Sequence, residues 1–570
     1  MEKKAVAILE QVVGEAALLK LPDNRALLYA SAGDVLWKRD EKRARQLFRQ
    51  SAQEIIQANN APASTDTSPM AMMSFLTNPS PRKQILLTVA KYDPEMALEL
   101  LYSTRPANVA VALTAKTTSA AAAGQKEKMT PAAMMENSRN KFLADDELRL
   151  EQSFSAQAAE KDPKKAAQLL RESIAKNGVT SSVFQILAKI NAKDNELANN
   201  LAKDIGNKLL DSDFAKNETE RNIVSSFLNQ YYLDSNKSKE QSKSIKIEEK
   251  LAKDLANKTA DYLLQLNTSK GFENYFQFRQ LTPVLEKIVP ERIAVIKQKQ
   301  AAMKKSLPES MTMFGDDAFD GNQTPDKMIT SAAKMPVQMR GMMYKAAVSE
   351  AVTNGTIDKA RESLMKAPEG KERDDALAFL DSKIAESKIK KGDFEEARKI
   401  IDALTSNKEK IERIVQMAIA FQAKDTKEDK EFATKLMDEA RSLTDNVPQD
   451  EDAINDYLKV ASGFAYIDPA TAFSMLDSFS TQANEIVNAA ALLAKYDKRN
   501  TAFQNGEMVL TRGLPRIGNN VFRYGKELNL LAQADIDRLR NMADRFDRAD
   551  ARVLLKLYIV QAFFNEKIGL

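Results

Sequence analysis

The sequence of 570 residues contains no cysteine and no histidine. Without these side chains the chain has no disulfide, no thiolate nucleophile, no Ser-His-Asp or Cys-His catalytic arrangement, no haem held through His or Cys and none of the usual zinc sites. The missing cysteines do not indicate a compartment, because cysteine-free chains occur in the cytosol and in the bacterial periplasm. The enzyme that we consider as an alternative uses carboxylates, with magnesium as its metal.

Aromatic residues are scarce, and Trp37 is the one tryptophan in the chain. Helical toroids can be glycosidases that use two carboxylates, but sugar subsites are generally lined by stacked aromatic rings, so the composition argues against a carbohydrate enzyme. A phosphate-binding loop is also missing, because Gly518 to Lys526 lacks the required glycine spacing and the Ser or Thr that follows it.

The chain has no large excess of charge of either sign, since 84 basic and 80 acidic residues leave a net charge of +4. The most lysine-rich stretch, residues 237–258, has no interleaved aromatic residues that could stack on bases. We interpret it as a solvated helix face preceded by a loop. The sequence therefore predicts neither a nucleic-acid partner nor an anionic membrane surface.

No apolar run approaches the roughly 18 residues that a membrane span needs, so we expect no membrane span. The first ten residues, Met1 to Glu10, are charged and already helical in pattern, with no apolar region followed by a small-residue cleavage site. This start predicts a cytoplasmic protein, or a periplasmic or secreted one if Met1 stands in place of a removed signal peptide.

The composition indicates an all-α fold. The chain is 43% hydrophobic, has only 18 glycines and 18 prolines, and lacks the alternating Val, Ile and Thr runs that are typical of strands.

One motif recurs along the chain and is clearest at residues 162–170. An aspartate is followed four residues later by alanine, and seven and eight residues later by apolar residues. The aspartates of the seven copies are Asp40, Asp93, Asp162, Asp194, Asp393, Asp429 and Asp468, and the alanines are Ala44, Ala97, Ala166, Ala198, Ala397, Ala433 and Ala472.

Each position of the motif has a physical role in a helix. The carboxylate can accept hydrogen bonds from the unpaired amides of the first turn, and it favours the positive end of the helix dipole. In three copies a proline follows, where its missing N–H costs nothing: Pro94, Pro163 and Pro469. The alanine leaves room for a neighbouring helix, and the apolar pair falls on the same helix face.

The spacing between copies predicts a helical solenoid. Successive aspartates lie 32 residues apart (Asp162 to Asp194), 36 apart (Asp393 to Asp429) and 39 apart (Asp429 to Asp468). Another amphipathic run precedes each aspartate, so one period of this length holds a pair of antiparallel helices. The predicted fold is an all-α solenoid of stacked helical hairpins with long low-complexity loops.

The segment from Ile384 to Leu404, which contains Gly392-Asp393-Phe394-Glu395-Glu396-Ala397, resembles a tetratricopeptide-type repeat. The resemblance is clearest between about Ser382 and Ser480, and the usual Trp-Leu-Gly-Tyr positions of the first helix are mostly absent. The whole chain is also similar to bacterial helical-repeat proteins rich in Asp-Pro-x-x-Ala-x-x-Leu units, for which no activity is known. These resemblances imply a TPR-like solenoid and no chemistry.

The interruptions of the helical pattern suggest how the chain divides. We expect an N-terminal helical-repeat region over residues 1–304, with loops at about 61–69 and 114–137, and a loop or linker over 305–341. A C-terminal TPR-like region then covers residues 342–570. It departs from the repeats at Thr511 to Gly518 and ends in a closing helix from Asp537 to about Asn565.

Three groups of residues outside the motif are weighed as sites, and none is assigned a role. Asp316, Asp317 and Asp320 have the spacing of a magnesium-diphosphate motif, but Gly315 and Gly321 flank them and no partner motif follows, so we interpret them as an acidic loop. Methionine clusters can bind Cu(I) or supply adaptable apolar contacts to a partner, but we interpret these as loops packed loosely onto the solenoid, which requires neither. These methionines are Met70, Met72, Met73, Met129, Met134, Met135, Met311, Met313, Met335, Met339, Met342 and Met343.

The third group is a set of cations near two aromatic residues, which is the most plausible anion-binding cluster in the sequence. Its members are Arg512, Arg516, Arg523 and Lys526, near Phe522 and Tyr524. We interpret it as an ordinary basic surface around a loop. The sequence therefore predicts no catalytic, cofactor-binding or metal-binding residue and no cofactor.

The function that this pattern favours is a non-enzymatic scaffold that binds a protein or peptide on the surface of the solenoid. The contact residues would be exposed polar ones on the first helices of the repeats, which a single sequence does not identify. The alternatives are a carboxylate- and magnesium-dependent enzyme on a helical scaffold and an architectural subunit of a bacterial assembly.

Overall fold

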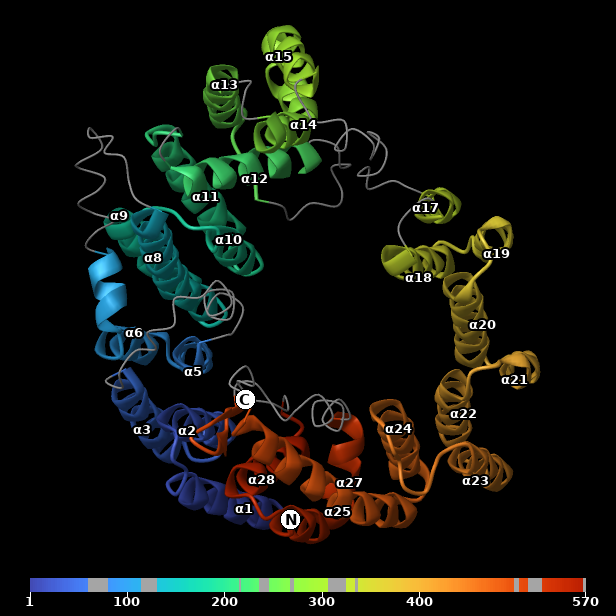
Figure 1. Cartoon of the computed structure of the whole chain (residues 1–570). Helices are drawn as coiled ribbons and strands as arrows, with labels where there is room; N and C mark the ends of the chain where they lie inside the picture. Colours follow the sequence, from blue (N-terminus) through green and yellow to red (C-terminus); the bar gives the residue numbers. More distant parts are fainter. Residues whose placement is uncertain are drawn as a thin grey trace. The chain divides into compact units, whose positions relative to one another are not determined.

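The computed structural model describes residues 1–59, 80–113, 131–214, 217–234, 245–266, 271–305, 324–333, 337–496, 502–510 and 525–566. Helices fill almost all of these residues, which confirms the predicted all-α class (Figure 1). The expected loop at 61–69 and most of the one at 114–137 lie outside the described residues.

The contacts divide the chain into two compact units. Met1–Arg39 and Phe314–Leu570 form unit 1, and Asp40–Met313 form unit 2. We expected residues 1–304 to form one region. The structural grouping differs at Met1–Arg39, because the first helices of the chain pack against the last ones.

Unit 2 is built from helices that pack mainly on their neighbours in the sequence. They are α3 (Glu41–Asn59), α5 (Pro81–Ala90), α6 (Pro94–Ser103), α8 (Pro131–Ala158), α9 (Pro163–Asn177), α10 (Val183–Asn191), α11 (Asn195–Leu210), α12 (Glu218–Asp234), α13 (Glu249–Gln265), α14 (Gly271–Ile288), the 3₁₀ turn η1 (Pro290–Arg292) and α15 (Ile293–Lys305). The expected loop over 114–137 is wrong from Pro131 onward, because α8 begins there.

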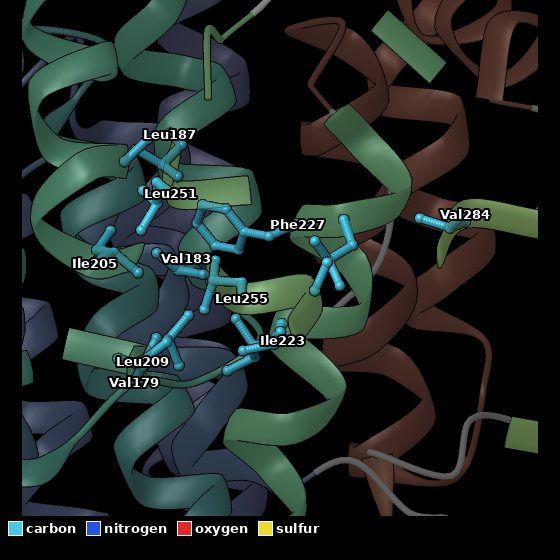
Figure 2. Close-up of a cluster of buried hydrophobic side chains, with 14 of the residues drawn as sticks. Val179, Val183, Leu187, Ile205, Leu209, Ile223, Phe227, Leu251, Leu255 and Val284 are labelled. Carbon is cyan, nitrogen blue, oxygen red and sulfur yellow. The ribbon is translucent and has the colours of Figure 1, made fainter. Parts of the chain in front are cut away.

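The core of unit 2 shows how one hairpin is stacked on the next. Val183 and Leu187 of α10, Ile205 and Leu209 of α11 and Phe227 of α12 belong to one buried cluster. Figure 2 shows these side chains converging with those of the neighbouring helices. A continuous core shared between successive hairpins is what a solenoid requires, since a single hairpin cannot bury its apolar face.

Unit 1 holds helices from both ends of the sequence. They are α1 (Glu2–Ala16), α2 (Pro22–Leu36), α17 (Pro325–Ala332), α18 (Val337–Thr353), α19 (Ile357–Lys366), α20 (Lys371–Lys391), α21 (Phe394–Ala403), α22 (Asn407–Gln422), α23 (Lys427–Ser442), α24 (Glu451–Ile467), α25 (Pro469–Ala494), α27 (Gly525–Asp544) and α28 (Ala549–Phe563). A short hairpin of β1 (Phe503–Gln504) and β2 (Glu507–Met508), which the sequence analysis did not predict, lies before α27.

Two other expectations for this unit are corrected. The predicted loop over 305–341 contains the helix α17 and the start of α18, whose apolar residues Ile329, Tyr344 and Val348 share one buried cluster. The predicted closing helix from Asp537 to Asn565 is two helices, because the chain leaves helical geometry between Asp544 and Ala549.

The repeats of unit 1 stack in a regular way, which confirms the solenoid. The first helices α18, α20, α22 and α24 contact one another in series, and each second helix (α19, α21, α23) contacts the first helices before and after it. Figure 1 shows α19, α21 and α23 along one side of the row of first helices.

The motif aspartate caps a helix in five of the seven copies. Asp93, Asp162 and Asp194 each accept a hydrogen bond from the backbone N–H three residues later, at 2.9, 3.0 and 2.9 Å. Asp40 does the same for α3 and Asp468 for α25. These carboxylates satisfy amides that the helix itself leaves unpaired.

Two copies depart from the predicted cap. Asp393 precedes α21 but accepts no bond from its first turn, and its carboxylate lies 3.3 Å from Lys388 Nζ instead. Asp429 is already inside α23. Thr426 caps that helix by accepting from the Asp429 N–H, and its hydroxyl donates back to the Asp429 carboxylate at 2.7 Å.

The motif alanine is buried in every copy. Ala44, Ala97, Ala166, Ala198, Ala397, Ala433 and Ala472 have no exposed surface. This confirms the sequence-based interpretation that the position is kept small where a neighbouring helix packs.

Replacing Ala397 by leucine should therefore overpack the contacts of α21. We expect Ala397→Leu to lower the free energy of unfolding by about 1–3 kcal/mol, measured by denaturant titration. Ala403→Leu, at an exposed position of the same helix, is the matched control and should leave stability nearly unchanged. Equal effects of the two substitutions would contradict the packing role of the motif alanine.

Two copies of the motif should respond differently when the aspartate is removed, because Asp162 caps its helix and Asp393 does not. Asp162→Ala should reduce the opening free energy of the first turn of α9 by about 1 kcal/mol, because it removes a bonded cap. Asp393→Ala should change α21 much less, since that carboxylate accepts no amide bond. Native-state hydrogen exchange of the two helices measures both effects, and a larger loss in α21 would be against the assignment.

Candidate functional site

Most of the residues that the sequence suggests as candidate sites lie outside the residues that the structure describes. Asp316, Asp317 and Asp320 lie outside the described residues, and so do Arg512, Arg516, Phe522, Arg523 and Tyr524. Lys526, the remaining member of that cluster, is exposed at the start of α27.

The methionine clusters are also mostly outside the described part of the chain. Met342 is exposed, and the neighbouring Met343 packs against the apolar cluster around Tyr344. The side chains of Met70, Met72, Met73, Met129, Met134, Met135, Met311, Met313, Met335 and Met339 are not described. Among the described residues, no three Asp or Glu side chains gather as metal ligands.

The first helices α20, α22 and α24 carry charged side chains where each helix packs against the next, and we call each such contact a seam. At the seam of α20 and α22, Arg413 is only 2% exposed. Its guanidinium donates to Ser382 Oγ at 2.9 Å and to Glu386 Oε2 at 3.0 Å, both on α20. A buried guanidinium is tolerated because these acceptors satisfy its donors.

Glu386 is the centre of this network. Lys383 and Lys390, on either side of it on α20, place their ammonium groups 2.8 and 2.7 Å from its carboxylate. Burial acts to raise the pKa of Glu386, but the hydrogen bonds from the two lysines and the charge of Arg413 outweigh it and lower the pKa to about 2. This carboxylate is therefore ionised at every physiological pH, and it pairs with two ammonium groups and one guanidinium.

At the seam of α22 and α24, carboxylates predominate. Lys408 pairs with Asp452 at 2.9 Å across this seam. Asp456, one turn further along α24, is half-buried near further carboxylates. Its burial, together with the charges of Asp452, Asp450 and Glu412, raises its pKa to about 6 despite the opposing charge of Lys408.

Some charged side chains of α20, α22 and α24 are exposed to solvent and are not confined to the contacts between these helices. On α22 the buried apolar positions Ile411, Ile414, Val415 and Ala418 repeat at helical spacing. Glu412 and Gln416 fall on the side of the helix away from that stripe. The side chains of Glu412 on α22, Lys390 on α20 and Asp452 on α24 are 41, 73 and 78% exposed. We call the outward side of α20, α22 and α24 the first-helix face.

The exposed groups of the first-helix face are polar and charged. Its carboxylates, ammonium groups and amide can form directional ion pairs and hydrogen bonds with a partner.

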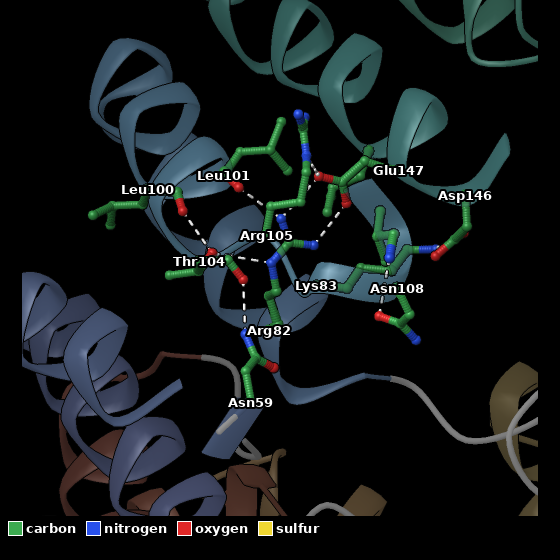
Figure 3. Close-up of polar contacts among 12 residues, drawn as sticks. Asn59, Arg82, Lys83, Leu100, Leu101, Thr104, Arg105, Asn108, Asp146 and Glu147 are labelled. Atoms are coloured by element: carbon green, nitrogen blue, oxygen red, sulfur yellow. Dashed lines mark hydrogen bonds and ion pairs between the residues drawn. The ribbon is translucent and has the colours of Figure 1, made fainter. Parts of the chain in front are cut away.

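A second charged cluster, in unit 2, is closed within the protein. Arg82 on α5 forms a bidentate pair with Glu147 on α8 at 2.7 and 2.9 Å, and Arg105 donates to the same carboxylate at 2.8 Å. Arg82 also binds the Leu101 carbonyl and the Thr104 hydroxyl at the end of α6 (Figure 3). These contacts are made to protein groups and join three helices, so we assign the cluster a structural role.

Sequence reasoning missed both charged networks. In α22 the one available signal was Arg413 between Ile411 and Ile414, a charge within an otherwise apolar pattern. The partners on α20 lie about 30 residues earlier in the sequence, and only the stacking of the hairpins brings them together.

Comparisons with known proteins add little to this description. No protein-family model matches the chain, and no curated protein matches it. One solved structure, described as a "Circular tandem repeat protein with novel repeat topology and enhanced subunit contact surfaces", covers 99% of this chain and 98% of its own at 11% identity and a TM-score of 0.13. At that TM-score the similarity carries no argument, and the fold rests on the helices and contacts described above.

In the part of the chain that the structure describes, no helix is both long enough and apolar enough to cross a membrane.

The raised pKa of Asp456 predicts how stability changes with pH. The unfolded chain ionises this carboxyl near pH 4, and the folded chain only near pH 6, so folding is increasingly penalised as the pH rises between these values and fully penalised above them. Asp456→Asn removes the penalty. It should be more stable than the wild type at pH 8 by on the order of 1 kcal/mol, after allowance for solvent screening, and equal to it below pH 4.

Denaturant titrations of both proteins at several pH values test this. Glu451→Gln, at an exposed position of the same helix, is the control. A stability difference for Asp456→Asn that stays constant from pH 4 to 8 would contradict the assignment.

Proposed function

We propose that this chain is a non-enzymatic scaffold that binds a protein or peptide on its first-helix face. The observation that carries the proposal is that successive stacked helices each expose a charged side chain: Lys390 on α20, Glu412 on α22 and Asp452 on α24. Lys390 and Glu412 also belong to the ion-pair network of Glu386 and Arg413. A charged side chain that an intramolecular ion pair already orients loses less conformational freedom when a partner binds. Ordering it therefore reduces the binding free energy less.

The order of charge along the face supports a directional partner. Around Glu386 lie two lysines and a buried arginine that also pairs with Glu412, whereas around Asp456 several carboxylates accompany one lysine. A partner laid across α20, α22 and α24 would therefore meet an environment of mixed charge and then a more acidic one. Complementary charge patterns of this kind select a partner and its orientation.

The geometry of stacking supports a partner longer than a single side chain. Neighbouring packed helices lie about 8–10 Å apart, so the three first helices present a surface spanned by several residues of an extended or helical segment. The repeats keep this spacing because the same hairpin recurs, which is how solenoids form extended binding surfaces.

The proposal is tested by capture from the native cell with a tagged full-length chain, followed by mass spectrometry. We expect a reproducible, stoichiometric protein partner with the wild type. The variant Lys390→Glu/Glu412→Lys/Asp452→Lys reverses one exposed charge on each first helix and should lose that partner.

A matched control makes the same charge changes on the second helices. Lys399→Glu/Glu395→Lys/Glu431→Lys alters exposed residues of α21 and α23 and should keep the partner. Circular dichroism and melting curves establish that both variants fold. The proposal fails if the wild type captures nothing, and the assignment of the face fails if both variants behave alike.

A further inference from the structure

The N-terminal segment, residues 1–39, occupies a socket made by the C-terminal part of the chain. α1 contacts α27 and α28, and α2 contacts α28. α28 is buried along almost its whole length, and its buried residues include polar and charged ones as well as apolar ones. A helix that is covered on all sides needs partners on all sides, and the N-terminal segment supplies some of them.

A buried lysine forms the first specific contact of the socket. Lys556 on α28 is only 2% exposed, and its ammonium group lies 2.6 Å from Asp544 and 2.7 Å from Glu15 on α1. Removing the N-terminal segment would leave this buried charge with one carboxylate fewer, which is costly in a low-dielectric site.

A second contact joins the start of α2 to the β1–β2 hairpin. α2 begins after Leu21, whose side chain cannot cap it. Glu507 of β2 instead accepts from the backbone N–H groups of Lys20 and Leu21, just before the helix, and from Asn24 Nδ2. Asn24 is fully buried, donates to the Met508 carbonyl at 2.7 Å and accepts from the Leu510 N–H at 2.9 Å.

The rim of the socket adds contacts at the surface. Lys4 on α1 pairs with Asp537 on α27 at 2.6 Å, and the Arg39 guanidinium lies 3.5 Å from the centre of the Phe564 ring. The segment is thus recognised by apolar burial, by two buried polar networks and by rim charges. This is the composition of a specific interface between separate partners.

The covalent connection between the segment and its socket is indirect. After Arg39 the chain leaves unit 1, forms unit 2 over Asp40–Met313, and returns at Phe314. The advantage of binding in cis comes only from the effective concentration that such a connection provides. Each contact in the socket could equally be made by residues 1–39 of another copy.

We infer that the socket of α27, α28 and the β1–β2 hairpin is also an interaction surface for a second copy of this chain, which fills it with its own residues 1–39. Exchange of an identical element between copies needs no new contact, and it is a low-cost route to a dimer. The exchanged form is expected when the segment is released and the protein concentration is high.

The absence of cysteine from the chain makes a clean cross-linking test possible. Full-length Lys4→Cys and full-length Asp537→Cys, the latter with a larger tag, are unfolded together, refolded at increasing concentration and treated with a short bismaleimide. The two positions face each other only across the socket. We expect a cross-linked product of the two chains whose yield rises with concentration.

Two further variants decide the outcome. Lys4→Cys mixed with Lys253→Cys, an exposed position of unit 2, measures random collisions and should give several-fold less product. The double variant Lys4→Cys/Asp537→Cys should cross-link within one chain at low concentration. The inference is overturned if the mixed pair never exceeds the collision control, or if the double variant does not cross-link within its own chain.

Discussion

The close approach of packed helices at small residues is the constraint on which the rest of the structure depends. The motif alanine is buried in every copy, including Ala397 and Ala433 in the best-formed repeats. Gly463 in α24 has the same effect, because a Cβ there would lie 2.8 Å from Val415 of α22 and 2.6 Å from Met437 of α23. Only a residue without a side chain lets the three helices meet at this point. The spacing of the first helices, and with it the layout of their charged face, follows from these contacts.

Charged residues at the seams then define how the stacked hairpins are aligned. A buried guanidinium such as Arg413 gains little net stability, because removing it from water costs about as much as its ion pairs return. It does, however, disfavour any arrangement in which its acceptors are displaced. Ser382 and Glu386 therefore act on the alignment of α20 against α22. The Arg82–Glu147 pair does the same for α5 and α8 in unit 2. Apolar contacts supply the stability of these seams, and the ion pairs supply their specificity.

Local features could be predicted from the sequence, and long-range ones could not. Asp162 caps α9, and Ala397 lies on the buried side of α21. The residues that indicate each feature lie within two helical turns of it, so the motif was enough to predict both. Asp429 misled the prediction because Thr426, three residues earlier, is an equally good cap and begins the helix first. The Arg413 network spans two hairpins, and the backbone just before α2 is bound by Glu507, which lies 486 residues later in the sequence. No periodic pattern records such a pairing, because neither partner belongs to the repeat.

The pairing of the two chain ends solves a problem that every solenoid has. A stack of hairpins leaves an apolar side at each end that needs a cover. In unit 1, α27 packs on α24, the last first helix of the row, and α28 packs on α27. The outer side of α28 is covered in turn by α1 and α2, with Lys556 and Glu507 bound to groups of that segment. The cover is therefore made from both ends of the sequence. Residues 1–39 thus pack on the helices that cover the end of the row of first helices, although they lie far from that row in the sequence.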